Sequence, residues 1–379
     1  MNQPLTFRDR GFHRRQAGRA FEAQTIHDLL ESVGSDTGTE PEATPATEDD
    51  HVYIVGDNSL LFTASGSDVK RREVARGILL EKWSQTAVED RRDLVPNRFY
   101  HRDHQHLLFR AALAYLVDLP LALHGHTGVG KTELVYYFAS LMQTPVYRMN
   151  LHGLSTTDDV IGKLLPAGRG RVTFQDGLVT TAVRNGGLLL LEEMNATGQE
   201  VWFSLHGLLD GSRRLVLVEK DNEVVHQHPY CRIFSTFNPS EYPTLYPGTK
   251  DLSAAYLRRW MSVRANFASK ENERTILLKR FPEYESEPLR DVLEKMLDVA
   301  MLARRILADG GRNFNFVMST GVLVEWAALT LHVGPIDAAR MSFYDLLEER
   351  TKTVMRDQVF SYATDWEIEK LGEPPRWSS

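Results

Sequence analysis

The sequence predicts an α/β fold, in which a core with a parallel sheet flanked by helices is followed by an all-helical lid domain. Three observations support this prediction. Short apolar runs alternate with helical patterns after residue 96, a glycine-rich loop joins one such run to the next helix, and strand patterns largely end near residue 269. Strands that alternate with helices are typical of a parallel sheet that is covered on both faces.

The elements of the α/β core are expected over residues 96–268. The expected strands are 119–123, 146–150, 187–191 and 232–236, and the expected helices are 105–117, 131–141, 178–185 and 198–209. The third strand contains four consecutive leucines, which match the continuous apolar run of a buried parallel strand. Residues 269–379 are expected to form the helical lid domain and a C-terminal tail. Apolar residues recur there at helical spacing, namely Leu289, Val292, Leu293, Met296, Leu297, Ile306 and Leu307.

The residues before the core divide into three segments. Residues 1–33 are a basic N-terminal segment, in which a short amphipathic helix is expected from Phe21, Ile26, Leu29, Leu30 and Val33. Whether this helix packs on its own chain or docks on a partner stays open. Residues 34–50 are rich in Gly, Pro, Thr and acidic residues, which predicts a disordered linker. Residues 51–95 are an accessory segment of unknown role, with an expected strand at 52–55 and a helical stretch at 69–83.

The composition is that of an ordinary globular protein. The 379 residues leave room for about two or three domains. Hydrophobic residues make up 42% and charged residues 25% of the chain, which argues against disorder and against a fibre. The formal net charge of -7 gives no support to a nucleic-acid partner, because such a protein should present a basic domain or face.

The cellular location is inferred from features that would mark export or a membrane. Cys231 is the only cysteine and cannot form an internal disulfide, so a reducing cytoplasm is the simplest compartment. No window approaches an apolar stretch of about 18 residues, and the N-terminus lacks the apolar core of a signal peptide. We therefore expect a cytoplasmic protein without a membrane span.

The most specific motif is the phosphate loop G-H-T-G-V-G-K-T at residues 125–132, which matches G-x-x-x-x-G-K-[ST] between an expected strand and an expected helix. Glycines let successive backbone N–H groups point at phosphate oxygens, and the following helix N-terminus also favours anions. Lys131 is expected to reach the β- and γ-phosphates, and the Thr132 hydroxyl to hold Mg²⁺. The predicted nucleotide-binding residues are Gly125, His126, Thr127, Gly128, Val129, Gly130, Lys131, Thr132 and Glu133.

Polar residues follow two of the expected strands at the sheet edge where open α/β folds bind ligands. Glu192 and Glu193 follow the leucine-rich strand; we assign Glu192 to the metal, and Glu193 to polarising the water that attacks the γ-phosphate. Asn238 follows strand 232–236 in the sequence F-N-P and is expected to orient the γ-phosphate or the water. Taken alone, an Asn-Pro pair is usually a turn. Its functional value comes from its place after the acidic pair.

These motifs together resemble an AAA+ ATPase. G-H-T-G-V-G-K-T, L-L-L-L-E-E-M-N and S-T-F-N-P stand in the order of that family's phosphate loop, acid motif and first sensor. Finer features resemble the MoxR branch and, within it, the group of CbbQ and NorQ, with a dynein-related ATPase domain. These features are S-T-T-D-D-V-I-G at 155–162, F-Q-D-G-L-V-T-T-A-V-R-N-G-G at 174–187, L-H-G-L-L-D-G-S-R-R-L at 205–215 and E-V-V-H-Q-H-P at 223–229. The resemblance covers about residues 96–331 and not the first 95.

The resemblance implies ATP and Mg²⁺ as cofactors and a homo-oligomer, usually a hexameric ring, with nucleotide between subunits. Arg258 or Arg259, in K-D-L-S-A-A-Y-L-R-R-W, would then be the arginine finger that reaches the neighbour's γ-phosphate. Residues 164–176 are predicted to form a hairpin, which resembles the family's pore-facing insert. Residues 219–228 resemble the hairpin that precedes the first sensor.

Two positions depart from the family pattern. The acid motif normally begins with Asp, and Glu192 adds a methylene that shifts the carboxylate, a change that matters where ~1 Å costs rate. Gly321, in M-S-T-G-V, stands where relatives carry the second-sensor arginine of S-T-R, and Arg312 is a candidate substitute. Hydrolysis is then slow, or the ring responds to nucleotide binding more than to turnover.

The leading hypothesis is a chaperone-like MoxR-type ATPase that remodels or activates a partner enzyme. Relatives often act with a partner that carries a von Willebrand factor A domain, but the client protein cannot be inferred from these residues. One alternative is a nucleotide-gated scaffold with little turnover, motivated by Glu192 and Gly321. Another is a GTP or nucleic-acid motor subunit similar to McrB, which the acidic net charge and the lack of an aromatic-basic stripe disfavour.

Overall fold

The structure is a computed structural model of the chain. It describes residues 18–21, 46–48, 51–55, 77–82, 91, 93–96, 107–242, 244–310 and 314–372. Residue contacts divide the chain into two compact units. The first consists of Met1–His124, Lys131–Asn238 and Gly248–Arg264, and the second of Gly125–Gly130, Pro239–Pro247 and Ala265–Ser379. Two short segments of the predicted core, one of them in the phosphate loop, therefore belong with the helical unit.

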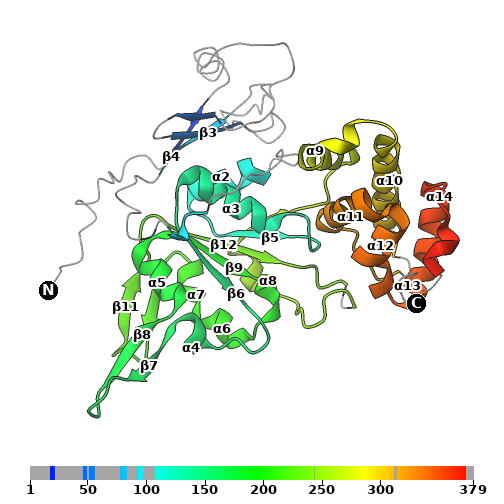
Figure 1. Ribbon diagram of the computed structural model, residues 1–379. Helices are drawn as coiled ribbons and strands as arrows, with labels where there is room; N and C mark the ends of the chain where they lie inside the picture. Colours follow the sequence, from blue (N-terminus) through cyan, green and yellow to red (C-terminus); the bar gives the residue numbers. More distant parts are fainter. Residues whose placement is uncertain are drawn as a thin grey trace, which may run out of the picture. The chain divides into compact units, whose positions relative to one another are not determined.

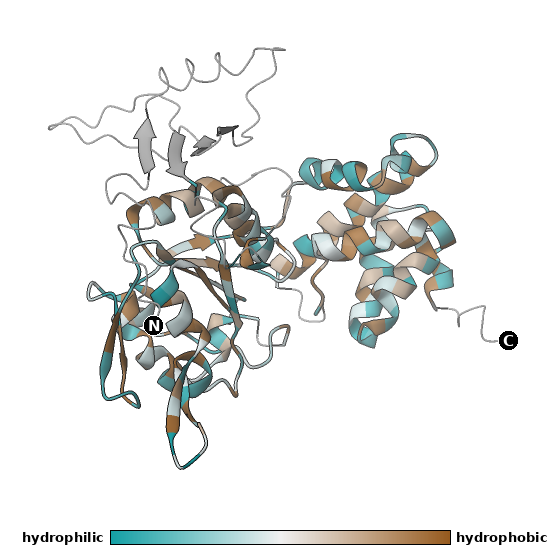
Figure 2. Cartoon of the chain, turned by 60° about the vertical axis from the view of Figure 1, so that its left-hand side comes forward, coloured by the Kyte–Doolittle hydropathy of each residue, from teal (hydrophilic) through white to brown (hydrophobic). Residues whose placement is uncertain are grey.

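A five-stranded parallel sheet forms the centre of the first unit (Figure 1). Its strands are β5 Leu121–His124, β6 Val146–Asn150, β9 Gly187–Glu192, β12 Cys231–Phe237 and β13 Met261–Arg264, in the order β13-β5-β12-β9-β6. Hydrophobic residues line these strands in Figure 2. Every residue of β9 is buried, and each fully buried leucine there contributes about 1.5–3 kcal/mol relative to an exposed one. The predicted parallel sheet is confirmed.

Helices cover both faces of this sheet because alternate β9 residues need apolar cover on each side. In Figure 1, α2 Leu107–Val117 and α3 Lys131–Met142 lie on one side, and α5 Leu178–Asn185 and α7 His206–Leu209 on the other. Leu189 and Leu191 pack into one cluster with residues of the second side. The predicted helix at 198–209 is two helices, α6 Gln199–Ser204 and α7, which meet at Leu205, where the N–H donates to the Trp202 carbonyl three residues back at 3.2 Å.

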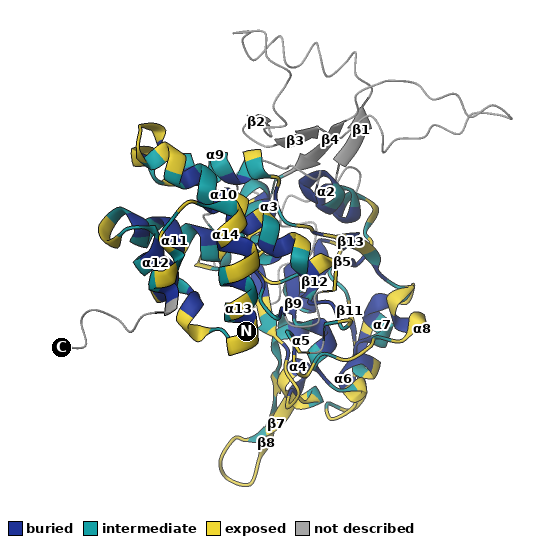
Figure 3. Ribbon diagram, turned by 90° about the vertical axis from the view of Figure 1, so that its right-hand side faces the viewer, coloured by how far each residue is buried: buried dark blue, intermediate teal, exposed yellow. Residues whose placement is uncertain are grey.

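Two antiparallel hairpins extend from the first unit. The first joins β7 Gly162–Pro166 to β8 Val172–Asp176, and its tip is exposed in Figure 3. Gly168, Arg169 and Gly170 all have positive φ, which produces the tight turn, so the hairpin predicted at 164–176 is confirmed. The second joins β10 Arg214–Leu217 to β11 Glu223–His226. Arg184 on α5 ties the hairpins together, since its guanidinium lies 2.7 Å from both Asp176 and Glu223.

The second unit is helical, as predicted. Its elements are α9 Lys270–Arg280, α10 Leu289–Ala308, α11 Thr320–Val333, α12 Pro335–Ser342, α13 Glu349–Val354 and α14 Ser361–Ala363, with short turns at Pro282–Glu285, Tyr344–Leu346, Met355–Phe360 and Ile368–Gly372. Trp326 is fully buried at the centre of the apolar cluster. Glu273 and Arg304 form a buried bidentate pair at 2.8 Å, and the Thr320 hydroxyl also donates to Glu273.

The N-terminal region contains a small antiparallel sheet, of which the sequence patterns predicted only the strand at 52–55. Its strands are β1 Gly18–Phe21, β2 Ala46–Glu48, β3 His51–Val55 and β4 Gly77–Glu81, in the order β1-β4-β3-β2. The helix predicted at 69–83 is therefore wrong over β4, because periodicity cannot assign so short an apolar run. Phe21 lies in a strand, the remainder of the helix expected there falls outside the described residues, and three residues of the predicted linker form β2.

No helix within the described ranges is long and apolar enough to cross a membrane.

Candidate active site

Lys131 begins α3 directly after the glycines of the phosphate loop, and its side chain is buried. Its ammonium Nζ donates to Asn238 Oδ1 at 3.1 Å. Burial lowers the pKa of Lys131 to about 8, because desolvation disfavours the charged ammonium, while the carboxylates of Glu193 and Glu192 oppose this effect. An anionic ligand beside the Lys131 ammonium would therefore offset the free-energy cost of burying its charge.

Asn238 connects Lys131 to Glu193. It follows β12, and its Nδ2 lies 2.9 Å from both carboxylate oxygens of Glu193. Its backbone carbonyl accepts a hydrogen bond from Asn195 Nδ2, also at 2.9 Å. Burial raises the pKa of Glu193, and the Lys131 charge and the Asn238 hydrogen bond oppose that rise. The predicted residues Lys131, Glu193 and Asn238 therefore meet in one hydrogen-bonded group.

The backbone at Glu193 is in a rarely populated conformation. Glu193 has φ 53° and ψ 44°, in the left-handed region that non-glycine residues seldom adopt. It heads the short turn Met194–Ala196, which the Ala196 N–H closes by donating to the Glu193 carbonyl at 2.8 Å. Such a conformation costs about 1–3 kcal/mol and persists where the surroundings enforce it. Here the turn directs the Glu193 carboxylate to Asn238 instead of continuing the strand.

Glu192, the last residue of β9, is buried and bonded on both carboxylate oxygens. The Thr132 hydroxyl donates to Oε1, and Arg148 Nε on β6 donates to Oε2. This hydrogen bond raises the pKa of Arg148. A hydroxyl and a carboxylate are hard oxygen ligands, so Thr132 and Glu192 fit Mg²⁺. The described residues contain no cluster of three or more His, Cys, Asp or Glu that could hold a metal ion.

The glycine part of the phosphate loop, Gly125–Gly130, is held within the second unit. Gly125, Gly128 and Gly130 all have φ between 73° and 151°. A Cβ on Gly125 would lie 2.1 Å from the Ala265 carbonyl oxygen, and one on Gly128 would lie 2.3 Å from the Ser319 Cβ. These glycines are required both by the backbone conformation and by the close approach of neighbouring atoms.

Tyr246 and two further aromatic rings surround the second and third loop residues. The Tyr246 hydroxyl accepts a hydrogen bond from the Thr127 N–H at 3.1 Å and pairs with His126 Nδ1 at 2.9 Å. The His126 ring stacks on Phe267 with a centroid distance of 5.5 Å, and its centroid lies 4.9 Å from that of Tyr242. The aromatic side chains therefore fix the shape of this part of the loop.

The other predicted residues do not join the Glu193 group. Arg258 and Arg259 lie at the end of α8 Ala254–Leu257, and within the described residues neither bonds to Lys131, Glu192 or Glu193. The Arg258 side chain is exposed, whereas Arg259 donates to the Ala255 carbonyl. Val129 is buried and Glu133 is exposed. Gly321 lies in the first turn of α11, and Arg312 falls outside the described residues.

Three residues that sequence reasoning did not select take part in these contacts. Arg148 lies near the carboxyl end of β6, the strand next to β9. An arginine at that position in the sequence could have been predicted to contact the acidic pair. Asn195 follows the acidic pair by two residues and is buried, which makes it a second such signal. Tyr246 carried no local signal, because only the fold brings it to Thr127.

Comparisons with known proteins agree with this geometry. A family model described as the AAA domain of the dynein-related subfamily matches residues 120–260. NorQ of Paracoccus denitrificans is 30% identical over 232 residues, which span 61% of this chain and 80% of NorQ. The aerobic cobaltochelatase subunit CobS of a Sinorhizobium species is 26% identical over 273 residues, which span 70% of this chain and 80% of CobS.

A further similarity is confined to part of a much larger protein. Midasin of Dictyostelium discoideum is 35% identical over 161 residues, which span 42% of this chain and only 3% of midasin. Midasin of Giardia intestinalis is 30% identical over 211 residues, which span 55% of this chain and 4% of that protein. This chain therefore matches only a small part of each midasin.

Proposed function

Since the chain belongs to the AAA+ ATPases of the MoxR type, with CbbQ and NorQ as relatives, we propose that it binds ATP with Mg²⁺ and hydrolyses it to remodel or activate a partner protein. The observation that carries the proposal is the group Lys131, Asn238 and Glu193, which links a phosphate-binding cation to a carboxylate through one amide. Positioned charge and orientation are what phosphoryl transfer requires of a protein.

Nucleotide binding begins with the phosphate loop. Backbone N–H groups of the loop and of the α3 N-terminus bind phosphate oxygens, and Lys131 moves its ammonium from Asn238 to the β- and γ-phosphates. Thr132 and Glu192 would hold Mg²⁺, which would neutralise phosphate charge when bound. Because the Lys131 ammonium then has anionic partners, its charged form is favoured again.

Hydrolysis depends on Glu193. When Lys131 turns to the phosphates, Asn238 keeps its two contacts with the Glu193 carboxylate and so holds it in place. The raised pKa of Glu193 makes it a better proton acceptor than an ordinary carboxylate. Glu193 accepts a proton from the attacking water, whose oxygen bonds to the γ-phosphorus as the bond to the leaving ADP oxygen breaks.

The arginine finger would come from a neighbouring chain and not from the chain that binds the nucleotide. We place the protein in a homo-oligomeric ring, for which a hexamer is the family's usual form, in the cytoplasm. Arg258 is the better finger of the two arginines, because its side chain is exposed, whereas Arg259 is held by the Ala255 carbonyl. An arginine at the γ-phosphate stabilises the charge of the transition state.

The partner proteins are proposed by analogy with the relatives. CobS is named as a subunit of a cobaltochelatase, which places one relative in an assembly that handles a metal. We propose that this chain likewise acts on an enzyme that needs activation, together with a partner that carries a von Willebrand factor A domain. No nucleic-acid role is proposed, given the net charge of -7.

The deciding experiment is the variant Glu193→Gln, assayed for ATP hydrolysis and for ATP binding. Loss of a general base is expected to lower kcat by roughly 10²–10⁴-fold, while ATP still binds. Glu200→Gln, an exposed carboxylate on α6, is the matched control and should retain full activity. Full turnover in Glu193→Gln would contradict the role given to Glu193.

A nucleotide-gated scaffold is the second candidate, and the contacts of Glu192 favour it. Both of its carboxylate oxygens are already bonded, one to the Thr132 hydroxyl and one to Arg148, so a metal must compete for them. A scaffold should assemble with ATP yet hydrolyse it at background rates. Glu192→Asp should then raise turnover by shortening the side chain, and rapid hydrolysis by the wild type would exclude this candidate.

A further inference from the structure

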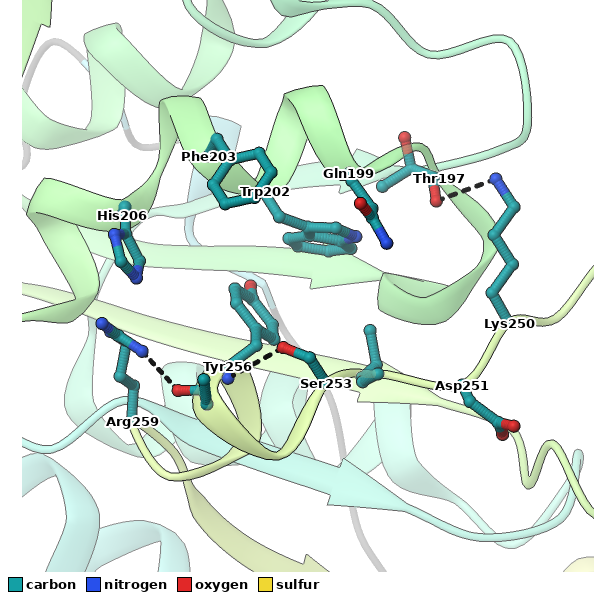
Figure 4. A pocket seen from close by; sticks show the side chains of 12 residues that line it. Thr197, Gln199, Trp202, Phe203, His206, Lys250, Asp251, Ser253, Tyr256 and Arg259 are labelled. Atoms are coloured by element: carbon teal, nitrogen blue, oxygen red, sulfur yellow. Dashed lines mark hydrogen bonds between the residues drawn. The ribbon is translucent and has the colours of Figure 1, made fainter.

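A pocket of about 260 Å³ lies between α6 and the segment Lys250–Arg259 (Figure 4). Trp202 from α6 and Tyr256 from α8 form its apolar floor, with ring centroids 4.8 Å apart. Phe203 at its edge is 70% exposed, which is unusual for so large an apolar side chain. The volume is below the roughly 300–1,000 Å³ of small-molecule sites, and it leaves room for an aliphatic side chain.

The mouth of the pocket carries more positive than negative charge. Two cations, Lys250 and Arg259, line it together with His206 and one carboxylate, Asp251. Lys250 Nζ donates to the Thr197 carbonyl at 3.2 Å, and Arg259 Nε is buried without a hydrogen-bond partner among the described residues. An occupant should therefore combine an apolar side chain with a nearby carboxylate.

An exposed apolar side chain with carboxylates nearby occurs on the helical unit of this same chain. Leu346 ends the short turn Tyr344–Leu346 and is 85% exposed, the highest value among large apolar side chains in the described residues. Carboxylates flank it in the sequence D-L-L-E-E. Asp345 contacts Arg340 at 3.5 Å and Glu349 pairs with Lys352 at 2.9 Å, but Glu348 is exposed and has no ion pair in the described part of the chain.

We propose that the pocket receives Leu346 of a second copy of this chain, with Glu348 of that copy meeting the cationic mouth. Pocket and leucine are two different patches, which is the arrangement of a head-to-tail interface that closes into a ring. The inference rests on the proposed ring and adds to it a specific apolar anchor. Arg258, next to the pocket-lining Arg259, would then face the same neighbour.

The pocket wall is connected to the Glu193 group by backbone and side-chain hydrogen bonds. The Lys250 N–H donates to the Asn195 carbonyl at 2.8 Å, and Asn195 Nδ2 donates to the Asn238 carbonyl at 2.9 Å. Asn238 in turn holds the Glu193 carboxylate. A neighbour seated in the pocket therefore stabilises the segment that positions Glu193, and turnover per subunit should rise with assembly.

The test is a disulfide between two different molecules. Leu346→Cys and Ala255→Cys proteins are prepared separately and mixed with ATP and Mg²⁺ under mild oxidation; Ala255 lines the pocket and is exposed. Because each molecule carries one new cysteine, a Leu346→Cys to Ala255→Cys dimer can only be intermolecular. Native Cys231 is buried and its pKa is raised to about 12, so it should not react. Tyr362→Cys, 81% exposed on the same unit, is the control and should not crosslink with Ala255→Cys.

A second measurement uses Leu346→Ala, an exposed position where folding should be unaffected. Loss of a buried leucine anchor should raise the protein concentration needed for assembly, and for half-maximal turnover, by about 10- to 100-fold. The plateau turnover should stay that of the wild type, and Tyr362→Ala should leave both concentrations unchanged.

The outcomes separate the inference from the proposed function. If wild type assembles and hydrolyses ATP but Leu346→Cys does not crosslink to Ala255→Cys, the anchor is wrong and the proposed function stands. If the wild type neither assembles nor hydrolyses ATP, the proposed function is wrong, and the anchor with it. A crosslink that Tyr362→Cys matches in yield also overturns the anchor, because it would reflect unspecific collision.

Discussion

The two parts of the phosphate loop are held in place by different kinds of interaction. Gly125–Gly130 is fixed by neutral groups, with the Tyr246 hydroxyl on the Thr127 N–H and aromatic rings around His126. Lys131 and Thr132, the next two residues, bond instead to Asn238 and to the carboxylate of Glu192. The neutral part determines the shape of the loop, whereas the charged part responds to pH and to the charge of the ligand.

The largest expected effect comes from removing the charged part. Lys131→Ala deletes the ammonium that neutralises the phosphates, and hydrogen bonds to charged groups contribute about 1.5–3 kcal/mol each. ATP affinity should fall by roughly 10- to 100-fold or more, measured by calorimetry or by competition with a fluorescent nucleotide. Lys163→Ala, an exposed lysine on β7, is the control. Unchanged affinity in Lys131→Ala would show that the charged part does not bind phosphate.

The next effect is a pH dependence that belongs to the charged part alone. Lys131 binds phosphate as the ammonium, and burial lowers its pKa to about 8, so the ammonium is lost as pH rises through about 8. The kcat/KM for ATP should therefore decline above pH about 8. On the acid side it should fall as Glu193 becomes protonated, at a pH above that of an ordinary glutamate.

Glu193→Gln sharpens this test. The Glu193 charge raises the pKa of Lys131, so its removal should move the alkaline decline of ATP binding to lower pH. Binding is measured as a dissociation constant across the pH range, which needs no turnover. A decline at the same pH in both proteins would mean that Lys131 and Glu193 do not interact.

The smallest effect is expected in the neutral part. Tyr246→Phe removes the hydroxyl that bonds to Thr127 and His126 while keeping the ring. At about 0.5–1.5 kcal/mol for each neutral hydrogen bond, loss of the bond to the Thr127 N–H should lower ATP affinity roughly 2- to 13-fold, without any shift of the alkaline decline. Tyr242→Phe is the matched control, because the Tyr242 ring contacts His126 but its hydroxyl makes no hydrogen bond in the described residues. An alkaline decline that moved with Tyr246→Phe would contradict the division into a neutral and a charged part.

Much of the core could be predicted from local patterns. Strand 146–150 and helix 178–185 have the predicted bounds, because their apolar periodicity and the glycines that flank the helix are local signals. Of the N-terminal sheet only the strand at 52–55 could be predicted, since the other strands are short and lack periodicity, and β1 pairs with β4 over a long separation. The break between α6 and α7 also escaped prediction, because no glycine or proline stands at Leu205 or directly beside it in the sequence.

The candidate site divides in the same way. The sequence by itself determined the chemistry, since Lys131, Thr132, Glu192, Glu193 and Asn238 are set by motifs at the ends of predicted strands. Only the tertiary structure decided how these groups are paired. The Asn238 bridge and the Arg148 contact with Glu192 join residues from different strands, and the left-handed turn at Glu193 directs its carboxylate to Asn238. A motif records which groups are present, whereas hydrogen-bond partners and burial depend on distances that the fold alone sets.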